Sequence, residues 1–92
     1  MNSITNKQKM EMLLKDYLDY KDIGVWFGKK KSWAQERLKE YKIRAIKENK
    51  KTISGYISTN AFIEYEEINF EEIYRKAKIE QELGLWNQIS EK

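Results

Sequence analysis

The stretch from Asp22 to Tyr41 most constrains the fold, because it places a glycine and three consecutive lysines between two segments with helical periodicity. Gly28 supplies the positive φ that a tight turn between helices commonly needs. Ser32, followed three residues later by Gln35, has the form of a capping box and predicts that the second helix begins there. The pattern is that of a helix-turn-helix. An ordinary amphipathic helix hairpin with a solvated lysine turn is the simpler interpretation of the same residues.

The second predicted helix, residues 32–41, has one apolar face and one polar face. On a period of 3.6 residues Ala34, Leu38 and Tyr41 share a face, which predicts that they pack into the core. The side chains left on the other face are Ser32, Gln35, Glu36, Lys39 and Glu40. A small helix that is polar outside and preceded by lysines has the properties of a DNA-recognition helix.

Composition excludes several classes of function. The sequence of 92 residues predicts one domain, and it contains no cysteine and no histidine, so thiolate or imidazole metal sites and the usual general base are absent. We therefore expect no enzymatic activity, no catalytic residues, no metal and no cofactor. With 13% aromatic and 36% charged residues the chain predicts a packed core with a solvated surface. No apolar run reaches the length of a membrane span, which predicts a cytoplasmic protein without membrane contact.

The net charge of +3 is distributed unevenly. Residues 29–51 contain ten Lys or Arg against three Glu, a local balance of +7, whereas residues 64–82 contain seven Glu against three Lys or Arg, a balance of −4. A concentrated basic segment is suited to phosphate contacts, because each contact is made locally and releases counterions. The common alternative for such a run is a solvated face without a partner.

The segment before this motif predicts a first helix that is capped by Thr5. Its apolar positions follow the stripe of a core-facing helix, and they are Met10, Leu13, Leu14, Tyr17 and Leu18. The helix ends near Tyr20, or it breaks near Leu18 so that Asp19 caps the next helix. Gly24 inside that next helix suggests close packing against a neighbouring helix.

The segment after the motif predicts a β-hairpin. Residues 42–48 and 52–58 are rich in β-branched side chains, and a short polar turn of Asn49, Lys50 and Lys51 separates them. The side chains expected to face the core are Ile43, Ala45, Ile53 and Ile57, and Lys47 would project at the tip. Gly55 suggests close approach of another backbone or a bulge.

The C-terminal part predicts two further helices. Ser58 or Thr59 would cap a helix that carries Phe62, Ile63 and Tyr65, and Asn69 with Glu72 has the form of a capping box for a last helix over about residues 69–84. The apolar stripe of that last helix comprises Phe70, Ile73, Tyr74, Ala77 and Leu83, followed by Leu85, Trp86 and Ile89. We expect the stripe to cover the core, with a dimer seam as the alternative.

The order of these segments resembles the winged helix-turn-helix of the MerR and excisionase-like superfamily over about residues 18–67. The residues that carry the resemblance are KDIGVWFGKKKSWAQERLKEYKI followed by KENKKTISGYISTNAFIEYEEI. The resemblance implies a single α+β domain over residues 1–92, mainly helical, with a core at about 5–68, a short β-hairpin wing and an added C-terminal helix. Proteins of this kind are common in phages and mobile elements, where they act as excisionases or small transcriptional regulators.

The resemblance also implies which side chains contact double-stranded DNA. The helix over residues 32–41 would enter the major groove, with Lys30, Lys31 and Ser32 at phosphates and Lys29 as a further DNA contact. Gln35, Glu36 and Lys39 would lie nearest base edges, because Gln suits adenine, Lys suits guanine and Glu accepts from cytosine. Arg37 would reach either. The basic wing over residues 47–51 would lie on the DNA backbone or in the minor groove through Lys47, Asn49, Lys50 and Lys51. Arg44 is the remaining expected DNA contact. Trp33 packs into the core or against a phosphate-sugar wall.

Two other functions compete with DNA binding. The acidic helix could dock on a basic partner, which would make the chain a phage-encoded module that inhibits a host protein. A nuclease with a carboxylate-bound metal would need a clustered acidic pocket, for which the sequence offers only the acidic helix. The DNA-binding hypothesis is compatible with a homodimer or an array on DNA through the C-terminal helix. It is also compatible with a host or recombinase protein as partner.

Overall fold

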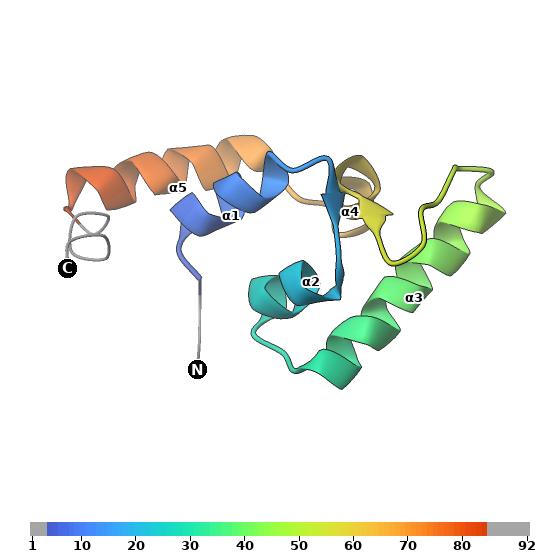
Figure 1. Ribbon diagram of the computed structural model, residues 1–92. Coiled ribbons are helices and arrows are strands. Elements are labelled where there is room, and N and C mark those ends of the chain that lie inside the picture. The colour runs from blue at the N-terminus through green and yellow to red at the C-terminus, as the bar shows by residue number, and fades with distance from the viewer. Residues whose placement is uncertain (1–3, 85–92) are drawn as a thin grey trace.

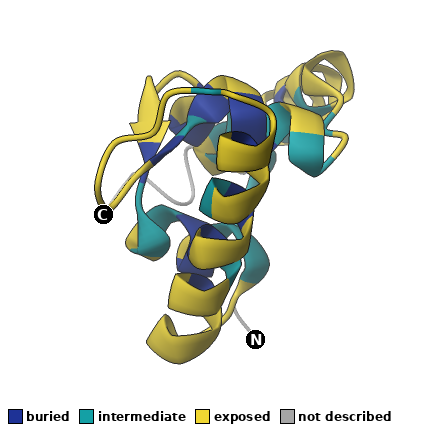
Figure 2. Cartoon of the chain, turned by 90° about the vertical axis from the view of Figure 1, so that its right-hand side faces the viewer, coloured by how far each residue is buried: buried dark blue, intermediate teal, exposed yellow. Residues whose placement is uncertain are grey.

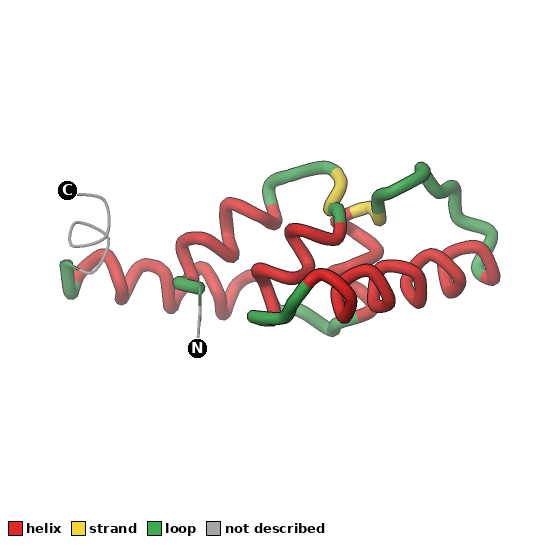
Figure 3. Tube along the Cα trace, turned by 60° about the horizontal axis from the view of Figure 1, so that its bottom comes forward, coloured by secondary structure: helices red, strands yellow, loops and turns green. Residues whose placement is uncertain are grey.

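The computed structural model describes residues 4–84 and has five helices and one small sheet in that range. Figure 3 shows that helices make up most of the described chain. The helices are α1 (Asn6–Leu13), α2 (Tyr20–Phe27), α3 (Lys31–Lys47), α4 (Thr59–Tyr65) and α5 (Phe70–Glu82). Two short strands, β1 (Tyr17–Leu18) and β2 (Ile57–Ser58), pair antiparallel with Leu18 opposite Ile57. Figure 1 shows α1 and α5 side by side at one end of the molecule and α3 at the other. The molecule measures 43 × 26 × 17 Å, which makes it elongated.

Four helices begin at side-chain caps that the sequence predicts. Thr5 and Gln8 form a capping box at α1, and Asp19 and Asp22 form another at α2, so the first helix breaks before Leu18 as in the second alternative. Ser58 accepts from the amide of Ala61 at α4, and Asn69 accepts from the amide of Glu72 at α5. These four starts confirm the expected positions, because a side-chain oxygen satisfies an otherwise unpaired amide.

The start of α3 differs from the expectation. Lys30 is the N-cap residue and makes no side-chain cap hydrogen bond, and Ser32 lies inside the first turn. The capping box expected from Ser32 and Gln35 is therefore wrong. The turn before it is as expected, because Gly28 has φ 66° and ends α2 in the left-handed conformation.

The expected β-hairpin wing is wrong. Residues 42–47 continue α3, and residues 49–56 form a loop with one isolated bridge between Ile53 and Tyr56. The only partner of β2 among residues 4–84 is β1, which comes from the segment between α1 and α2. The helix continues because Tyr41 and Ala45 extend the buried stripe of Ala34 and Leu38. Burial of this continuous stripe outweighs the modest β preference of the isoleucines.

Asn49 ends α3 instead of turning a hairpin. It has φ 61°, its amide donates to Ile46 O at 3.0 Å, and the amide of Lys50 donates to Ala45 O at 2.9 Å. This pair of bonds is a Schellman cap with asparagine at the left-handed position. As a consequence Ile43 and Ile53, which were expected in the core, are 46% exposed. Gly55 has φ 84° with no atom within 4 Å of an added Cβ, so it serves a turn and no close approach.

Phe62 lies at the centre of the core and is fully buried. Its ring makes edge-to-face contacts with Trp26 at 5.3 Å, Tyr41 at 5.7 Å and Phe27 at 6.4 Å. Through these contacts α4 holds α2 and α3 together. Figure 2 shows that the buried residues concentrate where these elements meet, whereas the helix surfaces turned outward are exposed.

The last helix packs mainly on the first. On α5, Ala77 is fully buried and Ile73 is partly buried against the core. At the end of α1, Leu14, which was expected in the core stripe of the first helix, is 74% exposed. Phe70, Tyr74 and Leu83 are also exposed, so the expected apolar stripe of α5 covers the core only in part. Leu85, Trp86 and Ile89 lie outside the described residues.

Candidate nucleic-acid interface

The candidate interface begins at the turn between α2 and α3. Gly24 allows the two helices to approach, because an added Cβ would lie 3.0 Å from Lys29 O and 3.5 Å from Ala34 Cβ. The amide of Lys29 donates to Gly24 O at 2.9 Å, which fixes the chain just before the lysines. This confirms the close packing expected at Gly24. The turn therefore presents the start of α3 in one defined orientation.

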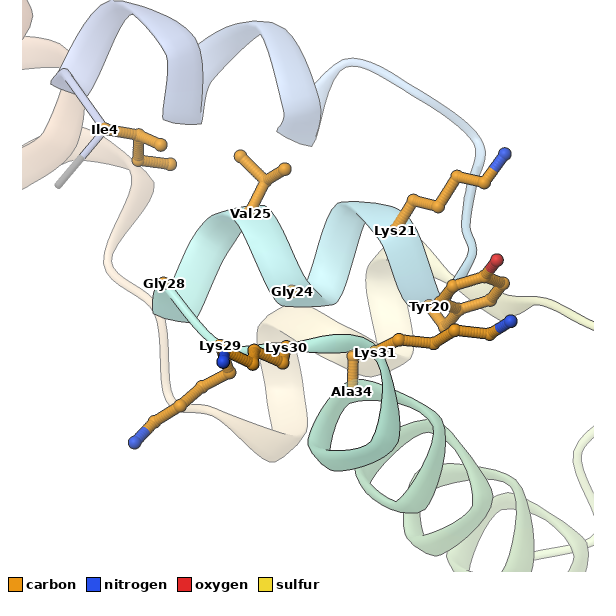
Figure 4. Close-up of a pocket in the computed structure, with 10 residues that line it drawn as sticks. All are labelled: Ile4, Tyr20, Lys21, Gly24, Val25, Gly28, Lys29, Lys30, Lys31 and Ala34. Carbon is orange, nitrogen blue, oxygen red and sulfur yellow. The ribbon is translucent and has the colours of Figure 1, made fainter. Parts of the chain in front are cut away.

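Four lysines surround a cleft of about 490 Å³ at this turn, and they are Lys21, Lys29, Lys30 and Lys31. In Figure 4 the side chains of Lys21 and Lys31 extend toward the same side, next to Tyr20. The ammonium group of Lys31 lies 5.9 Å from the centre of the Tyr20 ring. Lys21 was not expected here, because it lies on the preceding helix and only the tertiary packing brings it to the turn.

The outward face of α3 continues from this cleft. Ser32, Gln35, Glu36 and Lys39 are all exposed, as expected for a helix whose opposite face is buried. Because the helix extends to Lys47, two further exposed side chains, Ile43 and Ile46, lie on the same face. Sequence reasoning missed both, although the continuing buried stripe at Tyr41 and Ala45 was the signal that could have revealed them. In Figure 2 this face of α3 is turned toward the viewer.

Trp33 lies at the edge between core and surface. Its ring packs edge-on against Phe27 at 5.2 Å, yet 36% of the residue stays exposed. The guanidinium of Arg37 and the ammonium of Lys29 lie 5.6 Å from its ring centre. The indole therefore packs on a core aromatic, the first of its two expected positions, and keeps an edge beside the basic turn.

Three cations expected at the interface form ion pairs with carboxylates of the same chain, and they are Arg37, Arg44 and Lys50. Arg37 Nη2 lies 2.8 Å from Glu66 Oε2, and its Nε donates to the Tyr41 hydroxyl at 3.3 Å. The Tyr41 hydroxyl in turn donates to the same Glu66 carboxylate. These bonds raise the pKa of Arg37 above its ordinary value. Arg37 therefore fastens α3 to the end of α4.

Lys50 and Arg44 are occupied in a similar way around Tyr65. Lys50 Nζ lies 2.9 Å from Glu64 Oε1 and 3.0 Å from Glu48 Oε1, and these carboxylates raise the pKa of Lys50. Arg44 pairs with Glu48 at 3.3 Å, and its guanidinium lies 4.2 Å from the Tyr65 ring centre. The hydrogen bonds from Lys50 and Tyr65 lower the pKa of Glu48.

The remaining expected cations form no ion pair within the part of the chain that the structure describes, and they are Lys29, Lys30, Lys31, Lys39, Lys47 and Lys51. Asn49 is exposed at the end of α3. Lys42, which was not expected at the site, donates from Nζ to Ile53 O at 3.0 Å and so holds the loop against α3. The basic charge available to a partner therefore gathers on α3 and the two loops that flank it.

No family model, curated protein or solved structure matches the chain in comparisons with known proteins. The geometry of the residues therefore carries the functional argument.

Between residues 4 and 84 no group of three or more Asp or Glu side chains is placed to hold a metal ion. In the same range no helix is long and apolar enough to cross a membrane.

Proposed function

We propose that the chain is a sequence-specific double-stranded DNA-binding protein that inserts α3 into the major groove. It is a helix-turn-helix protein of the MerR and excisionase-like kind, in which the loop over residues 48–56 takes the place of the wing. The role that suits such a protein is that of an excisionase or small transcriptional regulator of a phage or mobile element.

The observation that carries the proposal is the separation of the cations into two groups. Arg37, Arg44 and Lys50 are bound to carboxylates, whereas the lysines at the start and on the outward face of α3 are exposed and form no ion pair with any residue between 4 and 84. A protein gains affinity for DNA by neutralising phosphates with such available charges. Lys29, Lys30 and Lys31 suit phosphates beside the groove, and Gln35, Glu36 and Lys39 suit base edges.

The alternative function through the acidic helix has less support. Glu64 and Glu66 bind Lys50 and Arg37, and Glu80 accepts hydrogen bonds from Asn6 and Lys7 at the start of α1. These three carboxylates act within the molecule. The four glutamates left between residues 64 and 82 are nearly balanced by the three cations of that segment, so little charge remains to attract a basic partner.

The test measures binding to a labelled duplex of random sequence at about 50 and about 200 mM salt. The informative variant is Lys30→Glu with Lys39→Glu, since both side chains are exposed and form no ion pair among residues 4–84. Lys50 is unsuitable, because its replacement would break internal ion pairs. We expect the wild type to bind with a steep salt slope and the variant to lose about one unit of slope per lysine.

The matched control is Arg75→Glu with Lys78→Glu, which makes the same change of net charge on α5. It should leave the affinity and the salt slope close to those of the wild type. If the wild type fails to bind duplex DNA at low salt, or if the control loses as much affinity as the α3 variant, the proposal is wrong. If the wild type and the variants behave as expected, selection from a random duplex pool identifies the target site.

A further inference from the structure

Two isoleucines lie exposed on the face of α3 that carries the polar side chains. Ile43 is 46% exposed and Ile46 is 60% exposed. Steps of four residues lead from Gln35 to Lys39 and on to Ile43, so the isoleucines continue the same outward stripe. The stripe is polar in its first half and apolar in its second half.

The loop after α3 carries a third exposed isoleucine. The bond from Lys42 Nζ to Ile53 O holds the loop backbone against α3, and Ile53 is 46% exposed. We call Ile43 and Ile46, which share one face of α3, the isoleucine patch. Exposed isoleucines gather here although the surrounding surface is strongly charged, and this indicates contact with something that offers apolar groups.

The charges around the isoleucine patch select the kind of partner. Lys39, Lys42, Lys47 and Lys51 are its neighbours along α3 and the loop, and none forms an ion pair with a carboxylate of residues 4–84. Glu40 lies nearer the start of the helix and pairs with Arg37 at 3.7 Å. A symmetric contact with a second copy would bring these lysines against their own counterparts, which is unfavourable. A polyanion with apolar groups inside its groove fits better.

Duplex DNA is such a polyanion, because the thymine 5-methyl group projects into the major groove between two rows of phosphates. The helix rise of about 1.5 Å per residue places Ile43 about 16 Å from Ser32 along α3, a span of roughly five base pairs. Resting on the proposed function, we infer that Ile43 and Ile46 contact thymine methyl groups and give α3 a preference for A·T base pairs at its C-terminal half.

The test compares two duplex polymers that differ in the methyl group, alternating poly(dA-dT) and alternating poly(dA-dU). Each methyl group buried against an isoleucine should improve affinity about fourfold. The wild type should therefore prefer the thymine polymer by about fourfold to sixteenfold. In Ile43→Ala with Ile46→Ala the ratio should fall close to one, because alanine keeps the helix but removes the contact.

Ile79→Ala is the matched control, since Ile79 is an isoleucine on α5 that is 43% exposed. It should keep the wild-type ratio. A wild-type ratio near one, or a ratio that persists in the double α3 variant, would overturn the inference while leaving DNA binding intact. Failure of the wild type to bind either polymer would overturn both proposals. Sedimentation of the wild type without DNA should also show a monomer. If the wild type associates, and if Ile43→Ala with Ile46→Ala abolishes this association, the patch contacts a second copy and the inference is wrong.

Discussion

Replacing Tyr41 with phenylalanine tests the hydrogen-bond network that fastens α3 to α4. The Tyr41 side chain is 5% exposed, and its hydroxyl donates to Glu66 and accepts from Arg37 Nε. A hydrogen bond to a charged group contributes about 1.5–3 kcal/mol. Because Glu66 keeps its bond to Arg37 at 2.8 Å in the variant, we expect Tyr41→Phe to lower the free energy of unfolding by about 1–2 kcal/mol.

The assay is urea denaturation followed by circular dichroism, supported by the Tm. For a domain of this size a loss of 1 kcal/mol lowers the Tm by about 4–8 °C. Tyr74→Phe is the control, because Tyr74 is 48% exposed and its hydroxyl makes no hydrogen bond within residues 4–84. It should change stability by less than about 0.5 kcal/mol. Equal effects of the two replacements would show that the network does not stabilise the fold.

The pH dependence of the same variant gives an independent check. Burial and the bond to Glu66 raise the pKa of Tyr41 well above its ordinary value. The unfolded chain therefore loses this proton at lower pH than the folded protein does, so the contribution of Tyr41 is complete below about pH 10 and declines as the pH rises further. The stability difference between wild type and Tyr41→Phe should shrink above that pH. A difference that grows with pH would refute the reasoning.

Two further predictions concern the turn and the joined ends of the molecule. Gly24→Ala should destabilise the fold by about 1 kcal/mol, since crowding against Lys29 O outweighs the gain in helix propensity; a thermal melt checks it, and an equal or higher Tm would contradict it. Glu80→Ala should destabilise more than Glu80→Gln, because glutamine keeps an acceptor for the Asn6 and Lys7 amides but loses the favourable charge at the helix start. Hydrogen exchange at these two amides should accelerate in both variants, and unchanged exchange would exclude the role of Glu80 as a cap.

Local features of the fold were predictable from the sequence. The caps at Thr5, Ser58 and Asn69 and the left-handed Gly28 each follow from short-range bonds within a few residues. The same local reasoning failed at Asn49, because a left-handed asparagine suits both a hairpin turn and a helix end. The choice depended on whether Tyr41 and Ala45 were buried, which is a property of the packed domain.

The candidate interface was predictable to a similar extent. The exposed positions of Ser32, Gln35, Glu36 and Lys39 follow from helix periodicity alone. The binding of Arg37 to Glu66 and of Lys50 to Glu64 could not be foreseen, since the partners lie 29 and 14 residues away in the sequence. Lys21 joined the surface for the same reason, because packing of the turn brought it there.

The internal ion pairs also explain why the strongly basic segment can fold against the acidic one without neutralising its own surface. Glu66 pairs with Arg37 of α3, and Glu64 pairs with Lys50, which follows the end of α3. Glu66 is partly buried and Glu64 is exposed, and both belong to α4 or its C-terminal end, so the pairs hold α3 from the side that faces α4. The lysines on the opposite face keep their charge toward solvent. Glu66→Lys should therefore weaken the attachment of α3 to α4. Any loss of DNA affinity should follow from the changed orientation of α3, and the salt slope per bound phosphate should stay unchanged.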